Sequence, residues 1–282
     1  MGEERVKSAK PNVAAVFGSL TKQVLTGVCA LGFAAAVSSS QVSASPLDVG
    51  DRWDWQLSGP VDLNRDVEML ALNPDLVTPE QLQVLKTQGI MTACYVSIGT
   101  VTVTSADKAA FPISVVGKNR DGHSGEQYLD IRRLDVLVPL MTKRFLACKA
   151  KGFTAVEPDN MDVYEKDSGF ALSAKDAIQY ATTLAHVAHG LGLRIAQKNA
   201  PELTGALLPH FDFAITDRCY QDGWCEQIAA YPRADKPAFN AEYTDADIDF
   251  GKACAEGARL NINMIQKDPD LSAPVITCQA EI

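Results

Sequence analysis

The chain has 282 residues, of which 46% are hydrophobic and 22% charged, and its formal net charge is −9. This composition is that of an ordinary globular protein and excludes a disordered, fibrous or low-complexity chain. The acidic balance also argues against nucleic acid as a partner, because phosphates demand a basic surface.

The N-terminal segment has the layout of a secretory signal. Residues 1–22 carry four basic side chains, residues 24–37 form an apolar run, and small residues precede Ser45. The apolar run is shorter than the roughly 20 residues that span a membrane. We therefore expect residues 1–44 to be cleaved and residues 45–282 to be secreted, without stable membrane association. A retained anchor or a wrongly chosen start codon is the alternative, because the basic region is long and contains two glutamates.

The remainder of the chain alternates short apolar runs with helical patterns. The runs typical of β-strands are residues 67–72, 90–98, 153–156, 193–197, 211–215, 238–241 and 260–265. The helical patterns between them are residues 79–87, 134–151, 174–190, 201–208 and 245–259. Strands separated by helices of this length pair in parallel through right-handed crossovers. The pattern therefore predicts the α/β class and, within it, a single-domain TIM-type (β/α) barrel.

A doubly wound open sheet is the competing architecture. Such a sheet typically carries a glycine-rich phosphate loop directly after a strand. The nearest candidate here, Gly190-Leu191-Gly192, precedes a strand, so we interpret it as the end of a helix and a turn. The sequence gives no sign of a cofactor.

Six cysteines lie in the predicted mature chain, an even number that favours disulfides in an exported protein. Cys219 and Cys225 are close enough in sequence to staple one loop, and Cys254 with Cys278 can tie down the C-terminus. Six cysteines nevertheless allow fifteen connectivities. A metal site is not expected, since the four histidines show no ligand spacing with the thiols.

Polar side chains follow four successive strands, at the end where barrel enzymes build their active sites. The four stretches are Glu157-Pro158-Asp159-Asn160, Gln197-Lys198-Asn199, Thr216-Asp217-Arg218-Cys219 and Glu242-Tyr243. Any one of them alone is explained as a helix cap or a soluble loop, but four in a row favour an active site. Glu157 and Asp159 are two residues apart, so both face the same way in a strand. Carboxyl groups held close together raise the pKa of one of them.

These stretches resemble a known family, glycoside hydrolase family 114, over nearly all of residues 51–282. The resemblance extends to Tyr128-Leu129-Asp130-Ile131-Arg132-Arg133, to Trp53-Asp54-Trp55-Gln56-Leu57 and to Cys94-Tyr95-Val96-Ser97-Ile98-Gly99. Members of that family are TIM-barrel endo-α-1,4-polygalactosaminidases. The resemblance implies hydrolysis of α-1,4-linked galactosamine in a partly deacetylated galactosaminogalactan, whose free amines suit an acidic protein. We expect this polysaccharide to be the partner of a monomeric enzyme.

The resemblance also implies the catalytic residues. The aspartate of the family's Glu-Pro-Asp-Asn motif matches Asp159. Its partner carboxylate lies in a motif that usually reads Asn-Glu-Gln-Cys, where this chain has Thr216-Asp217-Arg218-Cys219. Asp159 and Asp217 are therefore the expected nucleophile and general acid/base, in an order that the sequence leaves unassigned.

The aspartate at position 217 is one methylene shorter than the glutamate of the family motif. Asp217→Glu is therefore expected to preserve or raise activity, unless the site has adjusted to the shorter side chain. The same departure leaves open a second function, a barrel that binds the cationic amino-sugar polymer without turnover.

Further side chains are expected to bind or orient the sugars. They are Glu157, Asn160, Lys198, Asn199, Glu242, Tyr95, Tyr164 and Trp55. Glu157 would tune Asp159 or bind an amino group. Glu242 would do the same from another strand, or replace Asp217 as the second carboxylate.

Two of these assignments have structural alternatives. Lys198 orients the substrate in one interpretation and forms a buried pair with Glu157 in the other. The aromatic side chains are candidate stacking surfaces for sugar rings. Trp55 and its neighbour Trp53 would equally well plug the barrel.

Overall fold

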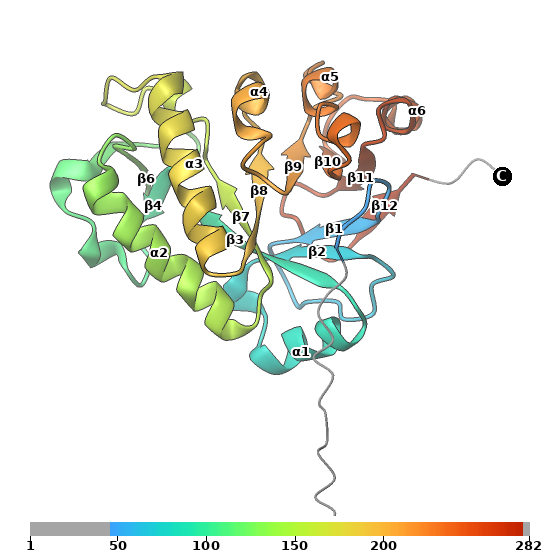
Figure 1. The fold of residues 1–282 in the computed structure, drawn as a ribbon. Helices are drawn as coiled ribbons and strands as arrows, with labels where there is room; N and C mark the ends of the chain where they lie inside the picture. The colour runs from blue at the N-terminus through green and yellow to red at the C-terminus, as the bar shows by residue number, and fades with distance from the viewer. Residues whose placement is uncertain (1–45, 279–282) are drawn as a thin grey trace, which may run out of the picture. The chain divides into compact units, whose positions relative to one another are not determined.

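The computed structural model describes residues 46–278, so the predicted signal, residues 1–44, lies outside the described residues. The main sheet has nine strands in the order β1-β2-β3-β7-β8-β9-β10-β11-β12 (Figure 1). These strands are Trp53–Gln56 (β1), Met69–Leu72 (β2), Met91–Ser97 (β3), Ala155–Asp159 (β7), Arg194–Lys198 (β8), Phe213–Asp217 (β9), Ala238–Tyr243 (β10), Asn263–Lys267 (β11) and Val275–Thr277 (β12). Adjacent strands run parallel except β11 and β12.

The parallel strands curve into a barrel whose seam lies between β1 and β11. At this seam the indole N–H of Trp53 donates to the carbonyl oxygen of Asn263 over 3.1 Å. The buried ammonium of Lys267 lies 2.8 Å from the carboxylate of Asp54. Side chains therefore close the sheet at this point, and the predicted TIM-type barrel is confirmed.

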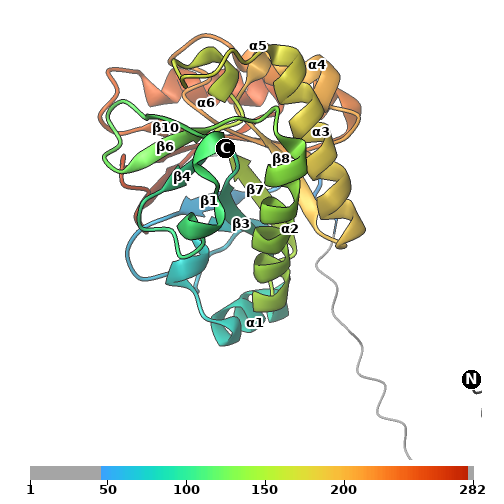
Figure 2. The same cartoon turned by 90° about the vertical axis from the view of Figure 1, so that its left-hand side faces the viewer.

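Helices cover the outside of the barrel. The α-helices are Pro79–Thr87 (α1), Leu134–Lys151 (α2), Ala174–Gly190 (α3), Thr204–Leu207 (α4), Cys225–Ile228 (α5) and Phe250–Leu260 (α6). The short 3-10 helices are Pro74–Leu76, Lys108–Ala110, Ile113–Val115, Val163–Glu165, Pro201–Leu203 and Pro232–Ala234. Figures 1 and 2 show α2 and α3 side by side on the outer face of the sheet. Within residues 46–278, no helix is long and apolar enough to cross a membrane.

Local sequence explains where the longer helices begin and end. At the start of α1 the Thr78 hydroxyl accepts from the Gln81 backbone N–H, while the Gln81 side chain accepts from the Thr78 backbone N–H. Ser173 and Asp176 form the same capping box at the start of α3. Helix α2 ends at Gly152, whose φ of 119° is accessible to glycine at little cost.

Alternate residues of each strand face the interior of the barrel, and this alternation decides which side chains meet there. On β9, Phe213 and Ile215 belong to the inner core, whereas Ala214 packs in the outer layer beneath the helices. Ala241 of β10 also belongs to the inner core. The residues two positions further along each strand, such as Asp217, therefore point to the inside at the C-terminal end of the barrel.

A second, three-stranded sheet, which the sequence did not predict, is inserted between β3 and α2. Its antiparallel strands are Thr100–Thr102 (β4), Val116–Asn119 (β5) and Glu126–Leu129 (β6). It begins at Gly99, where an added Cβ would lie 2.0 Å from the carbonyl oxygen of Asn160. Only glycine fits this approach, which brings the insertion against the end of β7.

Three disulfides link the cysteines of the barrel. They join Cys94 to Cys148, Cys219 to Cys225 and Cys254 to Cys278. The two pairs that the sequence suggested are confirmed. The remaining bridge ties strand β3 to helix α2.

Candidate active site

A buried lysine lies between two aspartates at the C-terminal end of the barrel. Lys198 ends β8, and its Nζ lies 3.0 Å from Asp217 Oδ2 and 3.5 Å from Asp159 Oδ1. The lysine side chain is 3% exposed, while those of Asp159 and Asp217 are 19% and 21% exposed. Both carboxylates are therefore partly exposed to solvent, and both contact the same buried lysine.

Asp159 is held by groups from two other segments. The hydroxyl of Tyr95 on β3 donates to Asp159 Oδ2 over 2.7 Å. Asn160, whose φ of 63° turns the chain away from β7, donates from Nδ2 to the hydroxyls of Ser97 and Thr100 over 3.0 and 3.2 Å. Asn160 thus fixes the strand end against the inserted sheet, while Asp159 Oδ1 lies 3.5 Å from Lys198 Nζ.

Both carboxylate oxygens of Asp217 accept hydrogen bonds from neighbouring side chains. Asn199 Nδ2 donates to Asp217 Oδ1 over 3.0 Å, and the Asp217 backbone N–H donates to Asn199 Oδ1 over 2.9 Å. The hydroxyl of Tyr243 on β10 donates to Asp217 Oδ2 over 3.3 Å. Together with Lys198, these contacts seat both oxygens of the short side chain.

Glu157 lies on the same face of β7 as Asp159 but is fully buried. Neither of its carboxyl oxygens has a hydrogen-bond partner among the described residues, and the same is true of the Trp55 indole nitrogen. Burial raises the pKa of Glu157 to about 8; Lys198 opposes this shift, and the charges of Asp159 and Asp217 add to it. The raised pKa favours the protonated form of Glu157 near neutral pH.

The charges of the other members of the cluster follow from their neighbours. Burial alone would raise the pKa of Asp159, but Lys198, the Tyr95 hydroxyl and the Asn160 backbone N–H outweigh it and hold that pKa below its ordinary value. Burial likewise works against a charged Lys198. Its neighbours, chiefly Asp217 and then Asp159, outweigh this effect and raise the pKa of the lysine. At neutral pH Asp159 is an anion and Lys198 a cation.

Glu242 does not join this cluster. It alternates with the inward-facing Ala241 and Tyr243, so its carboxylate lies on the outer side of β10. There it accepts from the backbone N–H groups of Tyr220 and Gln221 over 2.8 and 3.3 Å, and from Asn240 Nδ2 over 2.8 Å. The structure thus places Glu242 against the loop after β9 and outside the cluster of Lys198, Asp159 and Asp217.

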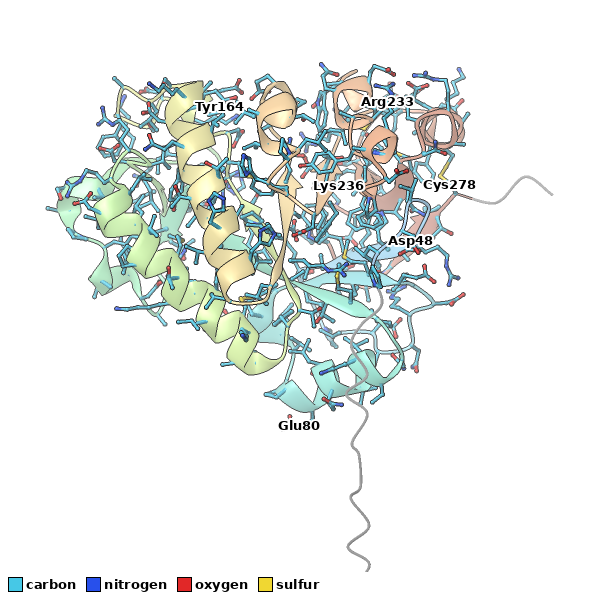
Figure 3. The ribbon with its side chains drawn as sticks, in the orientation of Figure 1. Asp48, Glu80, Tyr164, Arg233, Lys236 and Cys278 are labelled. Atoms are coloured by element: carbon cyan, nitrogen blue, oxygen red, sulfur yellow. A yellow bond between two sulfur atoms is a disulfide. The ribbon has the colours of Figure 1, made fainter. Side chains whose placement is uncertain are left out.

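The predicted aromatic residues take different places. Trp55 is 2% exposed, and Lys198 Nζ lies 4.7 Å above the centroid of its ring. Trp53 is equally buried beside it, with ring centroids 6.3 Å apart. Both tryptophans therefore fill the barrel below the cluster, and no ring face is open to a sugar. Tyr164 lies at the outer rim, between α3 and α4 at the top of Figure 3, where its hydroxyl contacts Glu202.

Two residues near the site were not singled out from the sequence. Tyr243 could have been found from the alternation on β10, because it lies two positions after the buried Ala241. Arg120 comes from the inserted sheet, and its NH1 pairs with Glu126 over 3.0 Å. The positive charge of Arg120 also contributes to the lowered pKa of Asp159. No local sequence pattern predicts this contribution, because it depends on how the inserted sheet packs against the distant end of β7.

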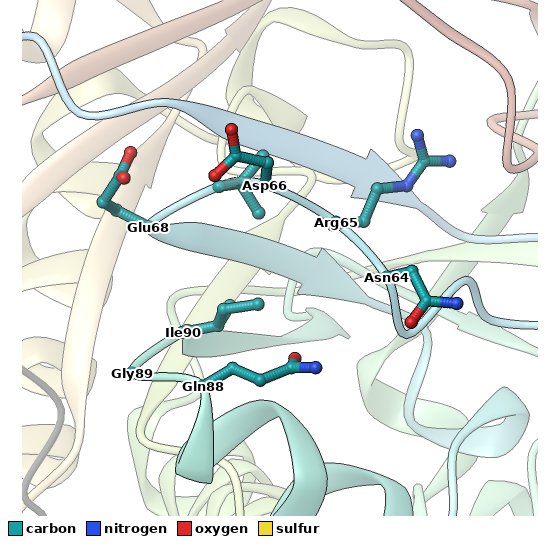
Figure 4. A pocket seen from close by; sticks show the side chains of 8 residues that line it. Asn64, Arg65, Asp66, Glu68, Gln88, Gly89 and Ile90 are labelled. Carbon is teal, nitrogen blue, oxygen red and sulfur yellow. The ribbon is translucent and has the colours of Figure 1, made fainter.

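A surface hollow elsewhere on the barrel is unrelated to this cluster. It is lined by residues 64–68 and 88–90, which precede β2 and β3 (Figure 4). It therefore lies at the N-terminal end of the strands, the end opposite to barrel active sites. Within residues 46–278, no group of three or more His, Cys, Asp or Glu side chains is arranged to hold a metal ion.

Comparison with known proteins links this arrangement to a family. Residues 34–282 match the model of glycoside-hydrolase family GH114. The structure of Ega3 from Aspergillus fumigatus, solved in complex with galactosamine, superposes with a TM-score of 0.77 at 27% identity, covering 83% of this chain and 97% of Ega3. The glycoside hydrolase domain of PelA from Pseudomonas aeruginosa gives a TM-score of 0.64 at 14% identity, covering 81% and 98% of the two chains. A search of curated protein sequences gave no match.

Proposed function

Because the chain belongs to glycoside-hydrolase family GH114 and is a glycosidase, we propose that it cleaves α-1,4-galactosaminidic bonds in a galactosamine-containing polysaccharide. The observation that carries this proposal is the pair Asp159 and Asp217, both partly exposed and both within reach of Lys198. Most glycosidases use two carboxyl groups that flank the scissile bond. The galactosamine bound to Ega3 supports the choice of sugar.

We assign the nucleophile to Asp159 and the acid/base role to Asp217. Asp159 is held as an anion, and its Oδ1 lies 3.5 Å from Lys198 Nζ. Once Asp217 has taken up a proton, Oδ1 of Asp159 attacks the anomeric carbon, the glycosidic C–O bond breaks, and the leaving oxygen takes its electron pair together with the Asp217 proton. Asp217 then removes a proton from water, whose oxygen attacks the same carbon and releases Asp159.

We propose that the two carboxylates act by a retaining mechanism. Because contacts of 3.0 and 3.5 Å join one Nζ to both, the two oxygens that face it are at most about 6.5 Å apart, a bound compatible with retention; inverting enzymes place their carboxyls about 6.5–9.5 Å apart. Retention requires a shorter separation of about 5–5.5 Å. Proton NMR of the first products, recorded before mutarotation, should therefore show the α-anomer.

The remaining members of the cluster have positioning roles in this proposal. Tyr95 and Asn160 orient Asp159, and Asn199 orients Asp217. Lys198 holds the two carboxylates in a fixed geometry. Its positive charge stabilises negative charge that develops during bond cleavage.

Product analysis on an α-1,4-galactosamine polymer tests the function. The wild type should release reducing ends, whereas Asp159→Asn and Asp217→Asn should abolish release while retaining the circular dichroism spectrum of the wild type. Groups that act as a unit lose nearly all activity when either is removed. Retention of the polymer without fragments by the wild type would instead support the binding protein that lacks turnover.

We further propose that the enzyme is secreted as a monomer, with a mature N-terminus near Ser45. The three disulfides support an oxidising compartment. Terminal sequencing of protein recovered from the culture medium checks the cleavage, and a secreted chain that begins at Met1 would contradict it.

A further inference from the structure

An exposed arginine follows Asp217 at the mouth of the site. Arg218 adopts a φ of 60°, and its backbone N–H donates to the carbonyl oxygen of Ala241 over 2.9 Å. Its guanidinium carbon lies 5.1 Å from the centroid of the Tyr243 ring. The hydroxyl of that ring donates to Asp217. A cation–π contact therefore holds the guanidinium beside the group that we assign as acid/base.

The charge of Arg218 is not compensated by a neighbouring carboxylate. Other cations near the site are paired, Lys198 with Asp159 and Asp217, and Arg120 with Glu126. Among the ion pairs of residues 46–278, none includes Arg218, and its side chain is exposed. An unpaired positive charge therefore lies over the aromatic ring whose hydroxyl contacts Asp217.

This placement discriminates between the two forms of a 2-amino sugar. A free galactosamine carries an ammonium group, which a guanidinium repels. An N-acetylated unit is neutral there, and its carbonyl oxygen accepts a hydrogen bond from the guanidinium N–H groups. Building on the proposed function, we infer that Arg218 is a specificity-determining residue that selects an N-acetylated sugar at the position beside Asp217.

The inference is compatible with the acidic character of the whole chain. The net charge acts over long distances and attracts a polymer that carries free amines. Arg218 acts at contact distance and excludes an ammonium from one position only. The preferred substrate is therefore a partly N-acetylated polymer rather than a fully deacetylated one.

The test compares two substrates in matched variants. Oligomers of α-1,4-galactosamine are used fully deacetylated and after partial chemical N-acetylation. The ratio of kcat/KM for the acetylated over the deacetylated oligomer should exceed one in the wild type. In Arg218→Gln it should fall on the order of fivefold or more, the effect of removing one repulsive charge near contact. Mass spectrometry of the wild-type products should place acetyl groups at one side of the cut.

Two further variants separate charge at this position from other effects. Arg218→Lys keeps the charge and should keep the ratio. Lys143→Gln removes another exposed cation, on α2 and away from the site, and should leave the ratio unchanged. An equal ratio in the wild type and in Arg218→Gln would overturn the role of Arg218 while the glycosidase function stands.

A wild type that cleaves neither oligomer would defeat the proposed function instead. The ratio of dissociation constants for the two intact oligomers, from affinity electrophoresis, then decides the role of Arg218 in the same way. A ratio that Arg218→Gln lowers supports the inference, and one that it leaves unchanged overturns it.

Discussion

Asp217→Glu should lower activity about a hundredfold, even though glutamate is the usual residue in the motif that this chain resembles. Asp217 is already seated, with Oδ2 at 3.0 Å from Lys198 and Oδ1 at 3.0 Å from Asn199. Tyr243 adds a third contact at 3.3 Å. An extra methylene displaces the carboxylate by on the order of 1 Å, and a misplacement of that size costs about a hundredfold in rate.

The assay is reducing-end release at a fixed pH, with kcat and KM determined separately. Asp217→Glu should lower kcat with little change in KM, since it keeps the charge but moves the proton donor. Asp217→Ala is the reference for complete loss of the group and should be slower still, because general acid/base catalysis contributes about 100- to 10,000-fold. A melting curve for each variant confirms that the fold is retained. Wild-type or higher turnover in Asp217→Glu would refute the conclusion that the site has adjusted to the shorter side chain.

Three further predictions address groups around the pair. The Tm of Glu157→Gln relative to the wild type should rise from about pH 5 to pH 8, because the unfolded carboxyl ionises near its ordinary pKa while the buried one keeps its proton until about pH 8, so that rising pH favours the unfolded wild type; a Tm difference independent of pH would contradict this. Glu242→Gln should lower stability by about 1–2 kcal/mol, because a buried anion that accepts from two backbone N–H groups is lost. The same variant should keep activity per folded molecule within about twofold, and loss as complete as in Asp217→Ala would return Glu242 to the mechanism. Replacing Cys219 and Cys225 together by serine should cost about 2 kcal/mol in thermal or urea unfolding, as expected for a short closed loop, and an unchanged midpoint would count against that bridge.

The barrel was predictable from the sequence because its strands and helices alternate in buried runs, but the strand ends were not. The runs at residues 153–156 and 211–215 correspond to strands Ala155–Asp159 and Phe213–Asp217. Both strands extend beyond the apolar run. Their backbone pairing continues through residues whose inward-facing side chains are polar and form the site. An apolar run marks burial, and strand pairing at the mouth of a barrel does not require apolar side chains.

The inserted sheet could not be predicted for a different reason. Strand β5 reads Val116-Gly117-Lys118-Asn119, with a single large apolar residue and no alternation. Its pairing with β6 and the glycine approach at Gly99 depend on contacts that are distant in sequence. The effect of Arg120 on the pKa of Asp159 could therefore not be predicted from the sequence.

The two faces of each strand also explain why all four polar stretches contribute a side chain to one cluster, while the Glu242 carboxylate lies outside it. Glu242 follows a strand as Asp217 does, but it is one position from the inward-facing Ala241, whereas Asp217 is two positions from the inward-facing Ile215. A shift of one residue turns a side chain to the opposite face of a sheet. Strands buried on both faces show no polar alternation in sequence, so only closure of the barrel reveals which face is inner. The side chains able to act with Asp159 are therefore those on the inward-facing positions of the strands, including Lys198 and Tyr243. Glu242 faces outward and binds the backbone of the loop that contains Arg218.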